Sequence, residues 1–114
     1  MDKVEVKIKK DLNDFIRKVA KKIKIEKVML FGSRARGDAG ASSDIDLIII
    51  SEDFYGKRSF ERPVGLYRLW WNRADKKEID IICLTPEEFE IMKKRIGAIR
   101  DAAREGIEIW EIKK

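Results

Sequence analysis

The sequence predicts an α/β domain of the α+β type, with helices packed on a mixed sheet of about four strands. Three apolar segments have the length and the β-branched composition of strands. They span residues 27–31, 44–51 and 78–84. Two longer segments, 10–24 and 85–105, repeat apolar residues every three or four positions, which is the period of an amphipathic helix. A chain of 114 residues, 44% of them hydrophobic, can bury one modest core, so we expect residues 1–114 to form a single domain.

The elements are expected in the order α-β-β-α-β-α-β. The first helix carries an apolar stripe opposite its lysines, formed by Leu12, Phe15, Ile16, Val19, Ala20 and Ile23. The strand at 27–31 and the strand at 44–51 enclose a loop rich in Gly, Ser, Ala and Arg. Pro63 suits the first turn of a helix over 63–71, although Gly65 disfavours it.

The second half of the chain contains the most complete helix signal. Thr85, Pro86 and Glu88 supply an N-cap threonine, a proline at the first helical position and a glutamate for a capping box. Gly106 can end this helix in a left-handed cap. The isoleucines between 107 and 112 predict a short last strand.

The residues that are absent exclude several kinds of catalysis. The chain contains no histidine, which excludes Ser-His-Asp and Cys-His groups, histidine-ligated zinc and a histidine general base. Cys83 is the single cysteine, so it cannot form an internal disulfide, and its apolar strand predicts a small buried residue and no nucleophile.

Composition also bears on location and partners. The longest purely apolar run is 47–50, far shorter than the roughly 20 residues of a membrane span, so we expect a cytoplasmic protein without membrane contact. The absence of glutamine and the heavy use of lysine, glutamate and isoleucine are typical of heat-adapted proteins and predict a thermophilic source. The net charge of +5 favours acidic partners and leaves direct binding of nucleic acid open.

A glycine-rich, basic segment follows the first predicted strand. Glycines at 32 and 37 let the backbone turn sharply and bring its N–H groups close to an anion. Ser33 adds a hydroxyl group, and Arg34 and Arg36 add charged donors suited to phosphate oxygens. The segment is not a Walker loop. The alternative is a tight turn with two solvated arginines.

Two aspartates, Asp44 and Asp46, begin the second predicted strand. Alternate residues of a strand point to the same side, so the two carboxylates are expected to lie together. Carboxylates held this close repel one another unless a cation lies between them, and Mg²⁺ prefers oxygen ligands that it shares with phosphates. A strand-entry turn without a metal is the alternative interpretation.

A third carboxylate, Asp80, lies between isoleucines in the strand at 78–84. If this strand neighbours the one that carries Asp44, Asp80 completes a three-carboxylate site suited to two Mg²⁺ ions. Glu78, two residues earlier on the same face, is the rival ligand. A charge on an edge strand that discourages aggregation is the alternative role for Asp80.

Together these motifs resemble the signature of the DNA polymerase β-like nucleotidyltransferases, and in particular the minimal nucleotidyltransferases called MNT. The resemblance rests on Gly-Ser-Arg-Ala-Arg-Gly followed by Ser-Asp-Ile-Asp-Leu, within 31–47, and extends to the strand of Asp80 and to 104–107. It implies that Gly32 and Ser33 contact the triphosphate of ATP, the nucleotidyl donor. It also implies that Asp44, Asp46 and Asp80 hold catalytic Mg²⁺, with a nucleotidyl group passing to a hydroxyl.

The resemblance further implies a partner, because small MNT proteins resemble the antitoxins of HEPN/MNT toxin–antitoxin pairs. Such antitoxins are similar to enzymes that transfer AMP to a tyrosine of the HEPN ribonuclease. Two alternatives stay open, an antitoxin that acts by occlusion without catalysis and a transferase that acts on a small molecule or an RNA end. Association of the chain into a homo-oligomer is also left open.

An aromatic and basic middle segment predicts a contact with the partner or acceptor. Its rings include Phe60, Tyr67 and the adjacent Trp70 and Trp71, which cannot both face one core from a helix. Packing of a tryptophan over the sheet edge is the alternative. Arg62 belongs to a basic group there that either steers a nucleotide or lies on a solvated face.

Overall fold

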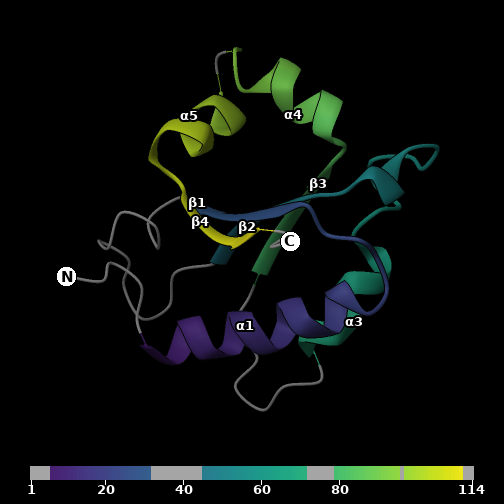
Figure 1. The fold of residues 1–114 in the computed structure, drawn as a ribbon, viewed down its shortest axis with the longest axis vertical. Coiled ribbons are helices and arrows are strands. Elements are labelled where there is room, and N and C mark those ends of the chain that lie inside the picture. The colour runs from purple at the N-terminus through teal and green to yellow at the C-terminus, as the bar shows by residue number, and fades with distance from the viewer. Residues whose placement is uncertain (1–5, 32–44, 72–78, 96, 112–114) are drawn as a thin grey trace.

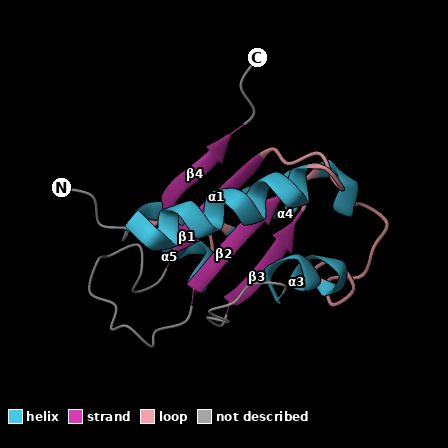
Figure 2. Ribbon diagram, turned by 90° about the horizontal axis from the view of Figure 1, so that it is seen from below, coloured by secondary structure: helices cyan, strands magenta, loops and turns pink. Residues whose placement is uncertain are grey.

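A computed structural model describes residues 6–31, 45–71, 79–95 and 97–111. It has three layers, with one sheet between two pairs of helices (Figures 1 and 2). The elements are α1 (Val6–Ala20), β1 (Lys27–Phe31), β2 (Ile45–Ile50), the 3₁₀ turn η1 (Glu52–Phe54), α3 (Val64–Trp71), β3 (Ile79–Leu84), α4 (Pro86–Met92), α5 (Ala98–Glu105) and β4 (Ile107–Glu111). The predicted α+β class and the mixed sheet of four strands are confirmed.

The sheet has the strand order β3-β2-β1-β4. Strand β2 pairs parallel with β3 and antiparallel with β1, and β1 pairs antiparallel with β4. The isoleucine-rich β2 is therefore a central strand, and all of its residues except Asp46 are buried. This explains its nearly continuous apolar sequence, because a strand covered on both faces need not alternate with polar residues.

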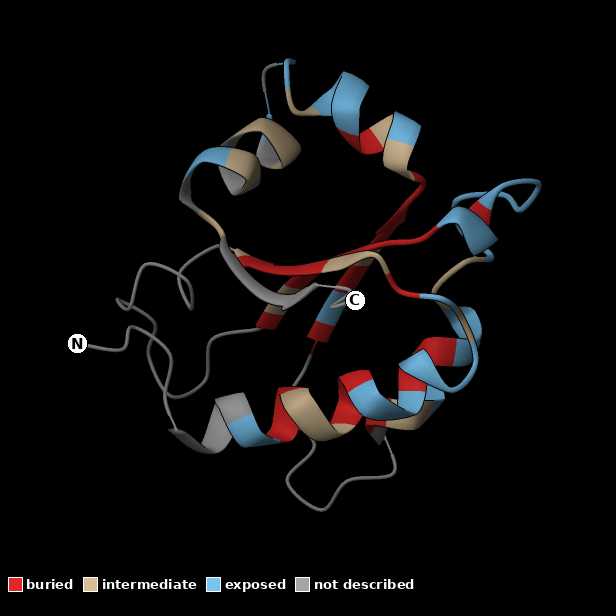
Figure 3. Ribbon diagram, viewed as in Figure 1, coloured by how far each residue is buried: buried red, intermediate tan, exposed pale blue. Residues whose placement is uncertain are grey.

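One face of the sheet packs against α1 and α3. The core on this side joins the apolar stripe of α1 to Ile45, Leu47 and Ile49 of β2, and Figure 3 shows the buried residues on the inner sides of the helices. Trp70 of α3 is 2% exposed and makes an edge-to-face contact with Phe15, with ring centroids 5.5 Å apart. Packing is therefore the role of Trp70, whereas the side chain of Trp71 lies outside the described part.

The opposite face packs against α4 and α5. Here Ile48 and Ile50 of β2, with Met29, meet Leu84 and Phe89. Thr85 caps α4 as predicted, because its side chain accepts the Glu88 N–H and the Glu88 carboxylate accepts the Thr85 N–H. The strict alternation of β2 between two helix layers decides which of its residues face α4 and α5.

Two helix boundaries differ from the predictions. The first helix spans Val6–Ala20 instead of 10–24, because short-range bonds such as Lys21 N–H to Lys18 C=O end it in a turn. The helix predicted over 85–105 is divided into α4 and α5. Gly97, in the connection, has a φ of 133°, a conformation that residues with a side chain rarely adopt. The apolar period continues across this break, so periodicity does not reveal it.

Candidate functional site

Asp46 and Asp80 occupy the same register position on the neighbouring parallel strands β2 and β3. Phe31, the last residue of β1, is the partner of Asp46 on its other side, so the three residues form one row across the sheet. Neighbouring strands lie roughly 4.8 Å apart, which places the two aspartates next to each other. The conditional prediction that the strand of Asp80 lies beside the strand of Asp46 is confirmed.

Both aspartates belong to the sheet face that α4 and α5 cover. Ile45 and Leu47, on either side of Asp46, belong to the core beneath α1 and α3, and strand alternation therefore turns Asp46 to the other face. The same alternation applies to Asp80 between Ile79 and Ile81. Asp46 is half-buried and Asp80 is exposed, so the row is open to solvent on the β3 side.

The structure brings together two of the predicted site residues and does not describe the others. Gly32, Ser33, Arg34, Arg36 and Asp44 lie outside the described residues, as does the rival acid Glu78. Chain connectivity does link them to the row, because Gly32 follows Phe31 and Asp44 precedes Ile45 by one residue.

The donor chemistry of the row fits a divalent cation with oxygen ligands. Carboxylates are the ligands that Mg²⁺ prefers, and two neighbouring carboxylates lower their mutual repulsion when they share a cation. Within the described ranges no group of three or more acidic, histidine or cysteine side chains forms a complete metal cluster. Asp46 and Asp80 would therefore need a further ligand, and Asp44 is the candidate that the sequence supplies.

Tyr67 supports the outer edge of β3 beside Asp80. Its hydroxyl oxygen accepts the backbone N–H of Ile81 at 3.1 Å, one residue beyond the aspartate. An unpaired N–H on an edge strand would otherwise need water or another strand. Nothing in the sequence marks this contact, because Tyr67 and Ile81 lie on separate elements.

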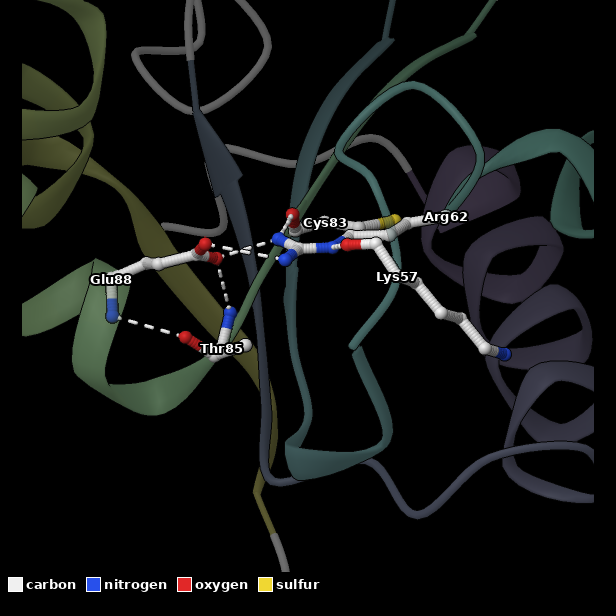
Figure 4. Close-up of polar contacts among 5 residues, drawn as sticks. All are labelled: Lys57, Arg62, Cys83, Thr85 and Glu88. Atoms are coloured by element: carbon white, nitrogen blue, oxygen red, sulfur yellow. Dashed lines mark hydrogen bonds and ion pairs between the residues drawn. The ribbon is translucent and has the colours of Figure 1, made fainter. Parts of the chain in front are cut away.

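Arg62 joins the same edge of β3 to α4, as Figure 4 shows. Its Nη1 donates to the Cys83 carbonyl at 3.1 Å, and Nη1 and Nη2 donate to the two Glu88 oxygens at 2.6 and 3.2 Å. Its Nε donates to the Lys57 carbonyl at 3.1 Å. The side chain is 6% exposed, so the predicted solvated or nucleotide-steering role of Arg62 is wrong. Its partners lie in other elements and could not be identified from a basic loop sequence.

Two titratable groups near Arg62 are shifted by this arrangement. The bonds from Arg62 lower the pKa of Glu88 more than any other cause, and the Thr85 N–H bonds lower it further against the opposing effect of burial. Burial raises the pKa of the Cys83 thiol to about 12, against a smaller opposite effect of the Arg62 charge. Cys83 is therefore a protonated, buried residue at neutral pH, as predicted.

Among the described helices, none has both the length and the apolar character that crossing a bilayer requires. Helix α1, with 15 residues, is the longest of them and carries lysines and aspartates.

The fold and the paired carboxylates agree with the family that the sequence matches. Residues 13–111 match the family described as "Polymerase beta, Nucleotidyltransferase". The match spans most of the chain, and the chain therefore belongs to the polymerase β-type nucleotidyltransferases. No curated protein sequence gives a match.

Three solved structures are similar to this chain. A Sulfolobus solfataricus protein assigned as a nucleotidyltransferase is 26% identical, with a TM-score of 0.68, over 93% of this chain and 82% of its own. A toxin–antitoxin structure with AMP-PNP is 18% identical, with a TM-score of 0.52, over 86% of this chain and 72% of its own. BolA1 from Arabidopsis thaliana is 19% identical, with a TM-score of 0.53, over 68% and 94%. The last two establish likeness of fold, and the set is consistent with an MNT-type member.

Proposed function

We propose that the chain transfers the AMP group of ATP, with Mg²⁺, to a hydroxyl group of a partner protein, and that the acceptor is a tyrosine of a HEPN ribonuclease toxin. The row formed by Asp46 and Asp80 is the single observation that carries this proposal. Within the described residues it places two carboxylates on one sheet face, at the end of β1 where the Gly32-Ser33 motif begins. Family membership makes nucleotidyl transfer the reaction class.

Each candidate residue has a definite role in this proposal. Asp44, Asp46 and Asp80 would hold the cation, while Gly32 and Ser33 would contact the triphosphate, aided by Arg34 and Arg36. Mg²⁺, when bound, neutralises negative charge on the phosphates during transfer. The chain itself contributes positioning and charge, which is most of what phosphoryl transfer requires, and the absence of histidine is no obstacle.

The proposed transfer is balanced without a further reactant. The acceptor oxygen forms a bond to the α-phosphorus of ATP, and the bond from that phosphorus to the oxygen bridging the β-phosphate breaks. Pyrophosphate leaves with the electron pair. Asp80, whose carboxylate is exposed, takes the proton of the acceptor hydroxyl.

Two further observations support a protein acceptor and an adenine nucleotide. The toxin–antitoxin structure with a similar fold contains AMP-PNP, an analogue of ATP. The net charge of +5 also favours acidic ligands such as nucleotides and acidic protein surfaces.

The test is transfer of label from α-³²P-ATP, with Mg²⁺, to a co-produced HEPN protein. We expect Asp46→Asn and Asp80→Asn to lower the rate by more than the roughly 10–100-fold that second-shell changes cost at metal sites. Asp14→Asn is the matched control, because Asp14 lies on α1 across the sheet and pairs only with the exposed Arg17, at 3.7 Å. This control is expected to keep the native rate.

The outcomes separate the proposed function from its alternatives. Labelled tyrosine in the partner that disappears with Asp46→Asn supports the proposal. A stable complex without label would instead establish an antitoxin that acts by occlusion. Label on RNA ends or small hydroxylated molecules, and none on the protein, would reject the protein acceptor while keeping the reaction class.

A further inference from the structure

Every large hydrophobic side chain that is exposed in the described part of the chain lies in one of two short segments. Tyr55, Phe60 and Val64 are in the loop before α3 and at its start, and Ile91 and Met92 end α4. Phe60 is the most exposed of the five, at 69%. Figure 3 shows both segments on the outside of the molecule. Single exposed hydrophobic residues are ordinary, but their restriction to two segments is not.

Arg62 connects the two segments. Phe60 and Val64 lie two residues before and after it, and Tyr55 lies two residues before Lys57, whose carbonyl accepts the Arg62 Nε–H. On α4, Ile91 and Met92 follow Glu88 by three and four residues, so they share the side of the helix that binds Arg62. We call Tyr55, Phe60, Val64, Ile91 and Met92 the Arg62 surface.

The loop that carries the Arg62 surface is held by backbone bonds along its length. Lys57 N–H bonds Phe54 C=O at 3.2 Å, and Glu61 N–H bonds Arg58 C=O at 2.9 Å. At the start of the loop, Asp53 accepts the Lys24 N–H at 2.7 Å. The apolar side chains are thus presented on an ordered framework, which lowers the entropic cost of binding a partner.

Charge on this surface indicates the chemistry of its partner. Each segment contains an adjacent pair of exposed cations, Lys57 with Arg58 and Lys94 with Arg95. Arg62 itself is occupied by Glu88 and is not available to a ligand. An occupant with apolar side chains and flanking carboxylates would match both properties.

The side chains favour a protein over a nucleic acid. Val64, Ile91 and Met92 are aliphatic and cannot stack on bases as aromatic platforms do. Methionine and aromatic residues are enriched in the cores of protein interfaces. We propose that the Arg62 surface binds an acidic, apolar segment of the acceptor protein, and in this respect the inference rests on the proposed function.

The Arg62 surface is separate from the carboxylate row. Asp80 is the second residue of β3, whereas α4 begins two residues after Leu84, which ends that strand. At about 3.3 Å per residue, Asp80 and Leu84 lie roughly 13 Å apart along the strand. Binding of the partner and transfer of the nucleotidyl group are therefore separable by mutation.

The test measures the dissociation constant of the complex with the co-produced HEPN protein by calorimetry. We expect the double variant Phe60→Ser/Ile91→Ser to weaken binding at least tenfold without changing the melting temperature, because both side chains are exposed. Arg58→Glu/Lys94→Glu should also weaken binding at least tenfold, and more at low salt than at high salt. Ala20→Ser, at an exposed position on α1, is the control that keeps native affinity.

Asp46→Asn distinguishes this inference from the proposed function. If Asp46→Asn binds normally but transfers nothing, both stand. If no variant or native protein transfers label, yet the serine variant loses binding, the surface stands and the enzymatic proposal fails. Native affinity in the serine variant, or no complex with native protein, overturns the surface. A dimer that the serine variant dissociates, or single-stranded RNA binding that it abolishes, would also overturn the assigned occupant.

Discussion

Replacing Arg62 with methionine should destabilise the protein more than any other change of a charged side chain among the described residues whose ion pairs are given above. Methionine preserves the length of the side chain and removes all of the hydrogen bonds that the guanidinium donates. The Cys83 carbonyl on the β3 edge and the Glu88 carboxylate then lose their charged donor. The loss follows from orphaned acceptors, because a hydrophobic side chain of similar length still fills the space.

The magnitude follows from the exposure of the two partners. Breaking a buried ion pair by removing one member costs roughly 3–5 kcal/mol. The Glu88 side chain is 35% exposed, so water replaces part of what Arg62 supplied, and the lower end of that range applies. We therefore expect a loss of about 3 kcal/mol in the free energy of unfolding. For a domain of this length, that lowers the melting temperature by roughly 12 °C.

The assay is urea unfolding followed by circular dichroism, with Arg58→Met as the matched control. Arg58 is an exposed arginine in the same loop, and its replacement should change stability by less than about 0.5 kcal/mol. A loss below about 1 kcal/mol in Arg62→Met would refute the structural role of the Arg62 bonds. A double-mutant cycle with Glu88→Gln should give non-additive losses, since the two residues share one interaction.

Acid titration supplies a second readout of the same pair. The pKa of Glu88 is lowered from its ordinary value of 4.5 chiefly by the Arg62 bonds. A lowered folded-state pKa contributes stability that is present above 4.5 and is lost as the pH falls through the folded value. Arg62→Met should therefore show a smaller loss of stability between pH 5 and pH 3 than the native protein, measured by urea unfolding at each pH.

Further substitutions test the remaining contacts. Trp70→Ala should cost about 3–5 kcal/mol in urea unfolding, because it removes a buried ring. Thr85→Ala should cost about 1 kcal/mol by removing the N-cap of α4, and Thr85→Ser should restore most of it. Tyr67→Phe should cost about 1 kcal/mol and speed amide exchange at Ile81, whose N–H loses its acceptor. Cys83, with a folded pKa of about 12 against 9.0 ordinarily, should resist Ellman's reagent at pH 8 until denaturant is added, and the stability that its burial lends should decline above pH 9; reaction at the rate of a free thiol would contradict its burial.

Much of the fold is predictable because local signals agree with tertiary packing. The bounds of β1 coincide with those expected, since an apolar run between a charged segment and a glycine has few other uses. The Thr85 capping box is encoded within four residues and appears as predicted. The division between α4 and α5 was not predictable from periodicity, because the positive φ of Gly97 leaves the apolar spacing unchanged.

The candidate site was predictable in part, for a different reason. Aspartates within apolar strands conflict with strand propensity, and that conflict marks Asp46 and Asp80 as residues with a role beyond packing. Their shared register depends on how β2 and β3 pair, which no local pattern specifies. The partners of Arg62 and Tyr67 depend on the same tertiary pairing, so the sequence gave no means of choosing them from among the other basic and aromatic residues.

The Asp46–Asp80 row also has a consequence for synthesis of the chain. The two aspartates are 34 residues apart, and β2 can pair with β3 only when the ribosome has released residues up to Leu84. A nascent chain that already displays the Gly32–Asp46 motif therefore holds half of the carboxylate pair. Because loop closure must precede this contact, assembly of the row is expected late in folding. A fragment recognised by its motif alone would match the family by sequence and still lack the second carboxylate.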